Sequence, residues 1–198
     1  MFKKISNNFV KWLIKNNILE ESEYELYSYC LTGLIEMGSN IIITITIGLI
    51  LNKLIDSVIF LLIIIPLRSI AGGFHAESSA VCFVVSIAIY IISIFLSSTL
   101  KIENSAAAII FLILLIAVGF LTPVDSCHKV LDKKQKLKQR ISYIKLSALI
   151  ILIFLIFMFF KCNRLCILID ITFLTVVILQ LLGNLKNRFL DKNYRLGA

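Results

Sequence analysis

The sequence predicts an all-α, polytopic integral membrane protein with about six transmembrane helices, and two observations carry this prediction. Hydrophobic residues make up 59% of the 198 residues, whereas charged residues make up only 16%. The apolar residues are also gathered in runs close to the roughly 20 residues that a helix needs to cross a bilayer. A β-barrel would show short alternating segments instead. We therefore expect residues 1–198 to form a single membrane domain.

The first 28 residues are predicted to form an amphipathic segment in the membrane interface. Phe2, Ile5, Phe9 and Trp12 recur at helical spacing, with lysines between them. An aromatic apolar face opposite a basic face is typical of a helix that lies in the interface plane. A helix packed on the protein's own loops is an equally good interpretation. The segment has no compact apolar region or cleavage site, so we do not expect a cleaved signal peptide.

Six apolar spans are expected within residues 30–182, followed by a basic tail over residues 183–198. The spans cover approximately residues 30–51, 54–67, 80–100, 105–122, 143–160 and 165–182. Pro66 is expected to limit the second span. Glu36 and Asn40 interrupt the first, where they either satisfy each other and a neighbouring helix or line the cavity used for chemistry. Asp170 raises the same question but is expected near the outer interface.

The basic residues are divided unequally between the two sets of span ends. One set of ends holds 16 Lys and Arg residues, and the opposite set holds 4. The first set comprises the N-terminal segment, the segment around His75, the Lys-rich segment 129–145 and the tail. By the positive-inside rule, both termini and His75 face the cytoplasm. This distribution accounts for the net charge of +8, so nucleic-acid binding is not expected.

The candidate active site lies between the second and third spans, where His75 precedes Cys82 by seven positions. On one continuous helix this spacing would separate them by about 10 Å along the axis, which is too far for direct proton transfer. The pair Gly72-Gly73 is expected to break the helix before His75. Ser78 or Ser79 is then expected to cap a new helix that begins just before Cys82.

These features predict a nucleophilic cysteine. In the first turn of a helix the macrodipole favours the thiolate form of Cys82, and His75 can accept the thiol proton and later protonate a leaving amine. Taken alone, a cysteine in an apolar helix is usually a small buried hydrophobic residue. A single histidine near the interface is usually a solvated polar residue. The hypothesis therefore depends on their occurrence together with the glycine pair and the helix cap.

The same residues carry a resemblance to a known family. The pattern Arg68-x3-Gly72-Gly73-x-His75-Ala76-x-Ser78-Ser79-x2-Cys82 closely resembles the signature of the AgrB-type accessory gene regulator membrane peptidases. The later Thr122-Pro123-Val124-Asp125-Ser126, followed by a Lys-rich segment, resembles that family's second cytoplasmic segment. Length and span number also agree, so the resemblance covers essentially the whole chain. One departure is Cys127-His128-Lys129, where relatives often have Asn-Lys-Pro.

The resemblance implies a cysteine endopeptidase of the bacterial cell membrane that needs no cofactor and trims an AgrD-type autoinducer propeptide for quorum sensing. His75 and Cys82 match the family's catalytic pair, and Arg68 and Gly73 match positions associated with activity. An acyl-enzyme thioester would let a Cys or Ser of the substrate close a thiolactone or lactone ring. A pocket shielded from water would favour this cyclisation over hydrolysis. The resemblance also suggests a homodimer.

Two further groups of residues are expected to support the site. Arg68 is predicted to pair with a carboxylate of Glu36, Glu77 or the propeptide, although it could instead reach only the lipid headgroups. Lys133 and Lys134, in the basic segment, are predicted to help capture the propeptide or anchor the surface. The alternative is that these lysines only set the orientation.

Two other functions compete with the peptidase. His75, Cys82, Cys127 and His128 are ligand types that bind zinc, but the usual C-x2–4-C spacing is missing. The five cysteines likewise show no regular disulfide framework. A small transporter or a non-catalytic membrane scaffold would suit polar residues within spans, but no inverted repeat is apparent between the two halves.

Overall fold

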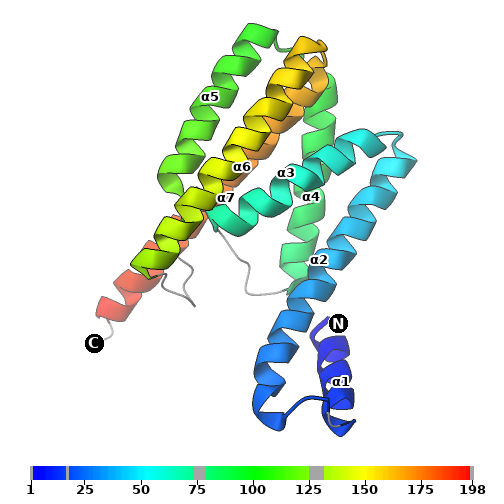
Figure 1. Cartoon of the computed structure of the whole chain (residues 1–198), viewed down its shortest axis with the longest axis vertical. Coiled ribbons are helices and arrows are strands. Elements are labelled where there is room, and N and C mark those ends of the chain that lie inside the picture. Colours follow the sequence, from blue (N-terminus) through cyan, green and yellow to red (C-terminus); the bar gives the residue numbers. More distant parts are fainter. Residues whose placement is uncertain (1, 17, 74–78, 125–131, 197–198) are drawn as a thin grey trace.

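The computed structural model describes residues 2–16, 18–73, 79–124 and 132–196. These residues form helices and turns, with no β-strand among them, so the all-α prediction is confirmed. The elements in order are α1 (Phe2–Lys15), η1 (Glu21–Glu23), α2 (Tyr24–Ile50), α3 (Leu54–Ala71), α4 (Ser79–Thr99), α5 (Asn104–Leu121), α6 (Lys133–Phe159) and α7 (Asn163–Leu196), shown in Figure 1.

Helices α2 to α7 are long and apolar enough to cross a membrane, which confirms the six predicted spans. The three short turns that join α2 to α3, α4 to α5 and α6 to α7 lie at one end of the bundle, here called the turn end (Figure 1). The opposite end of the bundle, here called the motif end, contains the end of α3, the start of α4, the end of α5 and the start of α6. The two sequence motifs therefore flank the same end of the bundle.

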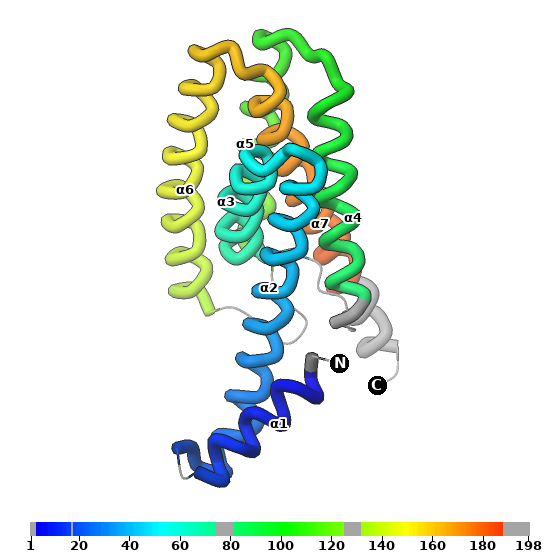
Figure 2. Tube along the Cα trace, turned by 90° about the vertical axis from the view of Figure 1, so that its right-hand side faces the viewer, coloured from blue at the N-terminus to red at the C-terminus, as the bar shows by residue number. Residues whose placement is uncertain are grey.

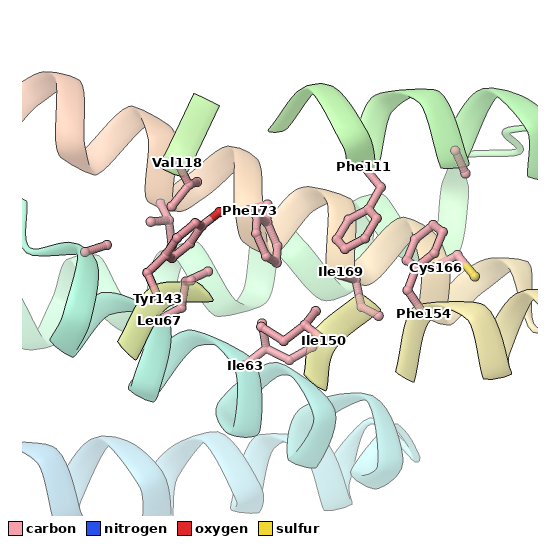
Figure 3. Packing of buried hydrophobic residues seen from close by; sticks show 13 residues of the cluster. Ile63, Leu67, Phe111, Val118, Tyr143, Ile150, Phe154, Cys166, Ile169 and Phe173 are labelled. Carbon is pink, nitrogen blue, oxygen red and sulfur yellow. The ribbon is translucent and has the colours of Figure 1, made fainter. Parts of the chain in front are cut away.

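Helix α7 is the centre of the fold. Its residues 165–173 are all buried, and α3, α4, α5 and α6 pack around it (Figure 2). The ring of Phe111 in α5 stacks on Phe154 in α6 at 4.2 Å and meets Phe173 in α7 edge-on at 5.3 Å (Figure 3). Such aromatic pairs each add about 0.5–1.5 kcal/mol beyond their area burial. Asp170 is only 4% exposed, so its side chain faces the interior of the bundle.

The sequence predicted that Pro66 limits the second span, but α3 continues beyond it to Ala71. Proline cannot donate to the carbonyl one turn earlier, which usually disfavours it within a helix. Here Ile63, Leu67 and Ala71 recur every four residues and are each no more than 3% exposed. Burial of this stripe offsets the missing hydrogen bond and holds the last turn of the helix in place.

The basic segment and the tail are also more helical than expected. Helix α6 begins at Lys133, where Asp132 and Gln135 form a capping box: the side chain of Asp132 accepts from the backbone N–H of Gln135, and the side chain of Gln135 accepts from the N–H of Asp132 at 3.3 Å. The Asp132 side chain also accepts from the N–H of Lys133 at 2.7 Å. An Asp followed three residues later by Gln is a sequence pattern typical of a helix N-terminus. Helix α7 runs to Leu196, so most of the predicted tail extends the last span.

At the turn end an ion pair joins α3 to α7, with Asp56 buried and the Arg164 side chain 47% exposed. Asp56 in α3 is fully buried and accepts from Arg164 of α7 at 2.9 Å. Next to it, the hydroxyls of Ser57 in α3 and Tyr90 in α4 share a hydrogen bond of 2.6 Å. A buried charge left without its partner is strongly destabilising. These contacts therefore fix α3, α4 and α7 relative to one another.

Helix α1 packs against α2 through its small polar side. Ser6 is buried and donates to the carbonyl of Ser28 at 2.8 Å. Its aromatic side faces away, with Phe9 stacked on Trp12 and each side chain about half exposed. Helix α1 therefore packs on helix α2 rather than on loops, and its aromatic face is exposed. Lipid in the interface is the natural environment for such a face.

Because Trp12 is the only tryptophan in the chain, its environment can be measured directly. We expect its fluorescence in reconstituted protein to be quenched more strongly by lipids brominated close to the headgroup than by lipids brominated near the chain ends. Unchanged fluorescence in both kinds of brominated bilayer would contradict an interfacial α1.

Candidate active site

Among the described residues α4 begins at Ser79, which places Cys82 in its first turn. Its side chain is partly exposed, unlike that of Cys166 in α7, which is completely buried. The interpretation of Cys82 as a buried packing residue therefore does not fit its position. His75, the predicted base, and Ser78, one of the two candidate caps, lie outside the described residues.

The glycine pair breaks the helix before the His75 segment. Helix α3 ends at Ala71, and Gly72 and Gly73 have φ angles of +71° and +129°. A side chain at Gly72 would lie 2.6 Å from the carbonyl oxygen of Val124, and one at Gly73 would lie 3.1 Å from that of Leu179. Both positions therefore require glycine for two reasons: the positive φ angle, and the close approach of another backbone segment.

The two sequence motifs meet at a junction of three helices at the motif end. The carbonyl of Ala71, at the end of α3, accepts from the N–H of Val124 at 3.0 Å and from the side-chain amide of Gln180 in α7 at 3.4 Å. The same amide donates to the hydroxyl of Thr122, just after α5, at 3.1 Å. We call Ala71, Gly72, Thr122, Val124 and Gln180 the α3–α5–α7 junction.

Gln180 is not among the residues predicted for the site, although its residue type and position were a signal for it. A primary amide within an apolar span is costly unless it finds partners, so such a residue is a candidate for a structural or functional contact. The residues themselves do not say which partners it finds. Its two acceptors lie 109 and 58 positions earlier in the chain.

In one interpretation Glu36 and Asn40 were expected to bind each other through their side chains, but only one side-chain hydrogen bond joins these residues. Asn40 donates to the backbone carbonyl of Glu36 at 3.2 Å, so its amide does not bind the carboxylate. The Oε1 atom of Glu36 is buried without a hydrogen-bond partner among the described residues. Arg68 lies half-buried in the last turn of α3, and Glu77, its other expected partner in the chain, lies outside the described residues.

Lys133 and Lys134 are both exposed in the first turn of α6. Positive charge at a helix N-terminus opposes the macrodipole and costs about 0.3–1 kcal/mol per residue. Helix stability therefore does not explain why two lysines stand there. Cys127 and His128, which belong to the alternative zinc set with His75, lie outside the described residues.

Comparison with known proteins identifies the family. Residues 6–182 match the family model described as Accessory gene regulator B. The chain belongs to the AgrB family. It is 31% identical over 155 residues to an AgrB-like protein of Clostridium perfringens strain SM101, and the alignment covers 72% of each chain. A second AgrB-like protein, from Clostridium perfringens strain 13, is 30% identical with the same coverage. No solved structure matches.

Membership of the AgrB family gives this chain a role in processing the autoinducer of an accessory gene regulator system. The substrate class that follows from it is a propeptide. Together with the six apolar helices, it also makes the chain a multi-pass membrane protein.

Proposed function

We propose that this AgrB-family protein is a membrane-embedded cysteine endopeptidase that cleaves an AgrD-like propeptide, with Cys82 as nucleophile and His75 as base. The observation that carries the proposal is the position of Cys82, partly exposed in the first turn of α4, directly after the segment that leaves α3 at Gly72 and Gly73. A helix N-terminus stabilises the negative charge of a thiolate. The glycine break removes the geometric objection that a continuous helix would raise.

In the proposed reaction His75 accepts the proton of the Cys82 thiol, and the sulfur attacks the carbonyl carbon of the scissile peptide bond. The C–N bond then breaks, and the departing amine takes the proton from His75. The product is a thioester between Cys82 and the N-terminal part of the propeptide. A Cys or Ser of that peptide can attack the thioester, displace the Cys82 thiolate and close a thiolactone or lactone ring.

Arg68, Lys133 and Lys134 are proposed to contact the propeptide rather than the reacting bond. All three lie at the motif end, in the last turn of α3 and the first turn of α6. A guanidinium can hold a carboxylate through two parallel hydrogen bonds, which a lysine cannot reproduce. Cleavage by Arg68→Lys therefore separates carboxylate recognition from anchoring in the headgroups, where lysine would serve as well.

The experiment that tests the function is co-expression with a propeptide encoded beside the chain, followed by mass spectrometry of the products. We expect the shortened peptide to appear with the mass of a ring, which is one water lighter than the linear fragment. A propeptide that remains intact in the presence of well-expressed protein would exclude the peptidase and favour a transporter or scaffold.

We further propose that the motif end faces the cytoplasm, on the basis of the unequal distribution of Lys and Arg. In a chain whose five native cysteines are replaced by serine, a membrane-impermeant maleimide should label Lys101→Cys on intact cells. It should label Lys134→Cys only after permeabilisation, and both positions are exposed in the structure. Labelling of Lys134→Cys on intact cells would reverse the orientation.

A further inference from the structure

One buried side chain at the motif end has no part in the chemistry proposed above. Gln180 in α7 is completely buried, and its Nε2 atom donates to Thr122 Oγ1 and to the carbonyl of Ala71. Its Oε1 atom has no partner among the described residues. The donor side of the amide is therefore the part that the fold uses, and it joins α7 to the ends of α3 and α5.

These contacts define where the chain leaves α3. The carbonyl of Ala71 is held from two directions, by the amide of Gln180 and by the N–H of Val124. Gly72 then passes against the carbonyl of Val124, and Gly73 against that of Leu179, the residue before Gln180. The backbone is thus enclosed by the α5 exit on one side and by α7 on the other, two residues before His75.

Helix α7 is also a support for the helix that carries Cys82. Helix α4 packs against α7 (Figure 2), and the turn-end contacts fix both helices relative to α3. Helix α7 therefore contacts both the backbone that leaves α3 and the helix that carries Cys82. A shift at the α3–α5–α7 junction would move the first without moving the second.

We propose that Gln180 is a positioning residue of the peptidase: it holds the backbone of Ala71 to Gly73, from which the chain continues to the proposed base His75. This inference rests on the proposed function. It assigns no chemical step to Gln180. An ångström-scale displacement of a reacting group is enough to lower turnover about 100-fold, so the effect is measurable.

The test compares variants that remove the contact but keep the shape. Gln180→Met retains most of the side-chain volume, and Thr122→Val removes only the hydroxyl. Each should lower turnover at saturating propeptide about 10- to 100-fold with little change in KM, because binding groups elsewhere are intact. Thr122→Ser, which keeps the hydroxyl, should cleave at close to the wild-type rate. The double variant should lose no more than Gln180→Met alone, because both changes remove the same contact.

Thr172→Val is the matched control. Thr172 is a fully buried threonine of α7 whose hydroxyl donates to the carbonyl four residues earlier at 2.7 Å, as Thr122 does at 2.6 Å. Among the described residues, Gln180 donates to Ala71 and Thr122 and not to Thr172. We expect Thr172→Val to leave turnover unchanged. A loss equal to that of Thr122→Val would show a general packing effect and overturn the inference.

Hydrogen exchange supplies a readout independent of activity. The amide of Val124, which donates to Ala71, should exchange faster in Gln180→Met than in the wild type or in Thr172→Val. Faster exchange with normal turnover would leave only a structural role and overturn the positioning proposal. A wild-type chain that cleaves no propeptide would overturn the proposed function and this inference with it. A cleaving wild type with a fully active Gln180→Met would overturn this inference alone.

Discussion

Replacing Cys82 by alanine is expected to abolish propeptide cleavage while the protein still inserts into the membrane. Cys82 is partly exposed at the start of α4, so loss of its sulfur leaves no large cavity in the core. Without a thiol no thioester forms, and cleavage and cyclisation should stop together. His75→Ala should lower cleavage by about 10²–10⁴-fold, the usual contribution of a positioned acid–base group. Mass spectrometry of co-expressed propeptide measures both effects.

The control for this prediction is Cys162→Ala. Cys162 is also partly exposed, but it lies at the turn end, between α6 and α7. This variant should retain most of the activity. If cleavage survived in Cys82→Ala, or if Cys162→Ala lost as much, the nucleophile would be wrongly assigned.

A second measurement examines the thioester itself. A propeptide whose ring-closing Cys or Ser is replaced by alanine cannot displace Cys82 from the acyl-enzyme. The mass of the N-terminal peptide fragment should then appear on the intact wild-type protein and be absent from Cys82→Ala. If no covalent adduct forms under any condition while cleavage proceeds, direct attack by water would replace the thioester route.

Substituting Gly72 by alanine is expected to have the next largest effect, on both stability and activity. Its backbone, with φ of +71° and ψ of −157°, lies in a region that is essentially restricted to glycine and costs another residue about 1–3 kcal/mol. The new Cβ would also lie 2.6 Å from the carbonyl oxygen of Val124, which can yield only if the exit from α5 moves. We expect a loss of about 2–4 kcal/mol in the free energy of unfolding, together with severely reduced cleavage.

Two glycines serve as controls for this prediction. An alanine at Gly38 in α2 would meet nothing within 4 Å, so Gly38→Ala should be neutral or slightly stabilising. An alanine at Gly48 would place its Cβ against the hydroxyl oxygen of Ser57 at the turn end, and should lower stability away from the site. Thermal unfolding in detergent and cleavage are measured on all three. Wild-type stability and cleavage in Gly72→Ala would refute the strained turn.

The helical content and the number of spans were predictable because they depend on local composition. A run of about 20 apolar residues buries its own backbone hydrogen bonds wherever it lies in the bilayer. The break at Gly72 was predictable for the same reason, since a glycine pair acts on the neighbouring backbone. The end of α3 was misplaced at Pro66 because the burial of Leu67 and Ala71, which outweighs the proline, comes from other helices.

What the sequence by itself determined is therefore the set of helices, their breaks and the residue types brought to one end of the bundle. Only the tertiary structure decided that Ala71, Thr122 and Gln180 meet there. Gln180 follows Ala71 by 109 positions and Thr122 by 58, and hydrogen bonds between helices leave no periodicity in the chain. The tertiary structure likewise decided that Asp56 binds Arg164 and that α7 forms the centre. Spacing along the chain governs contacts within a helix, whereas contacts between helices depend on how their buried faces pack.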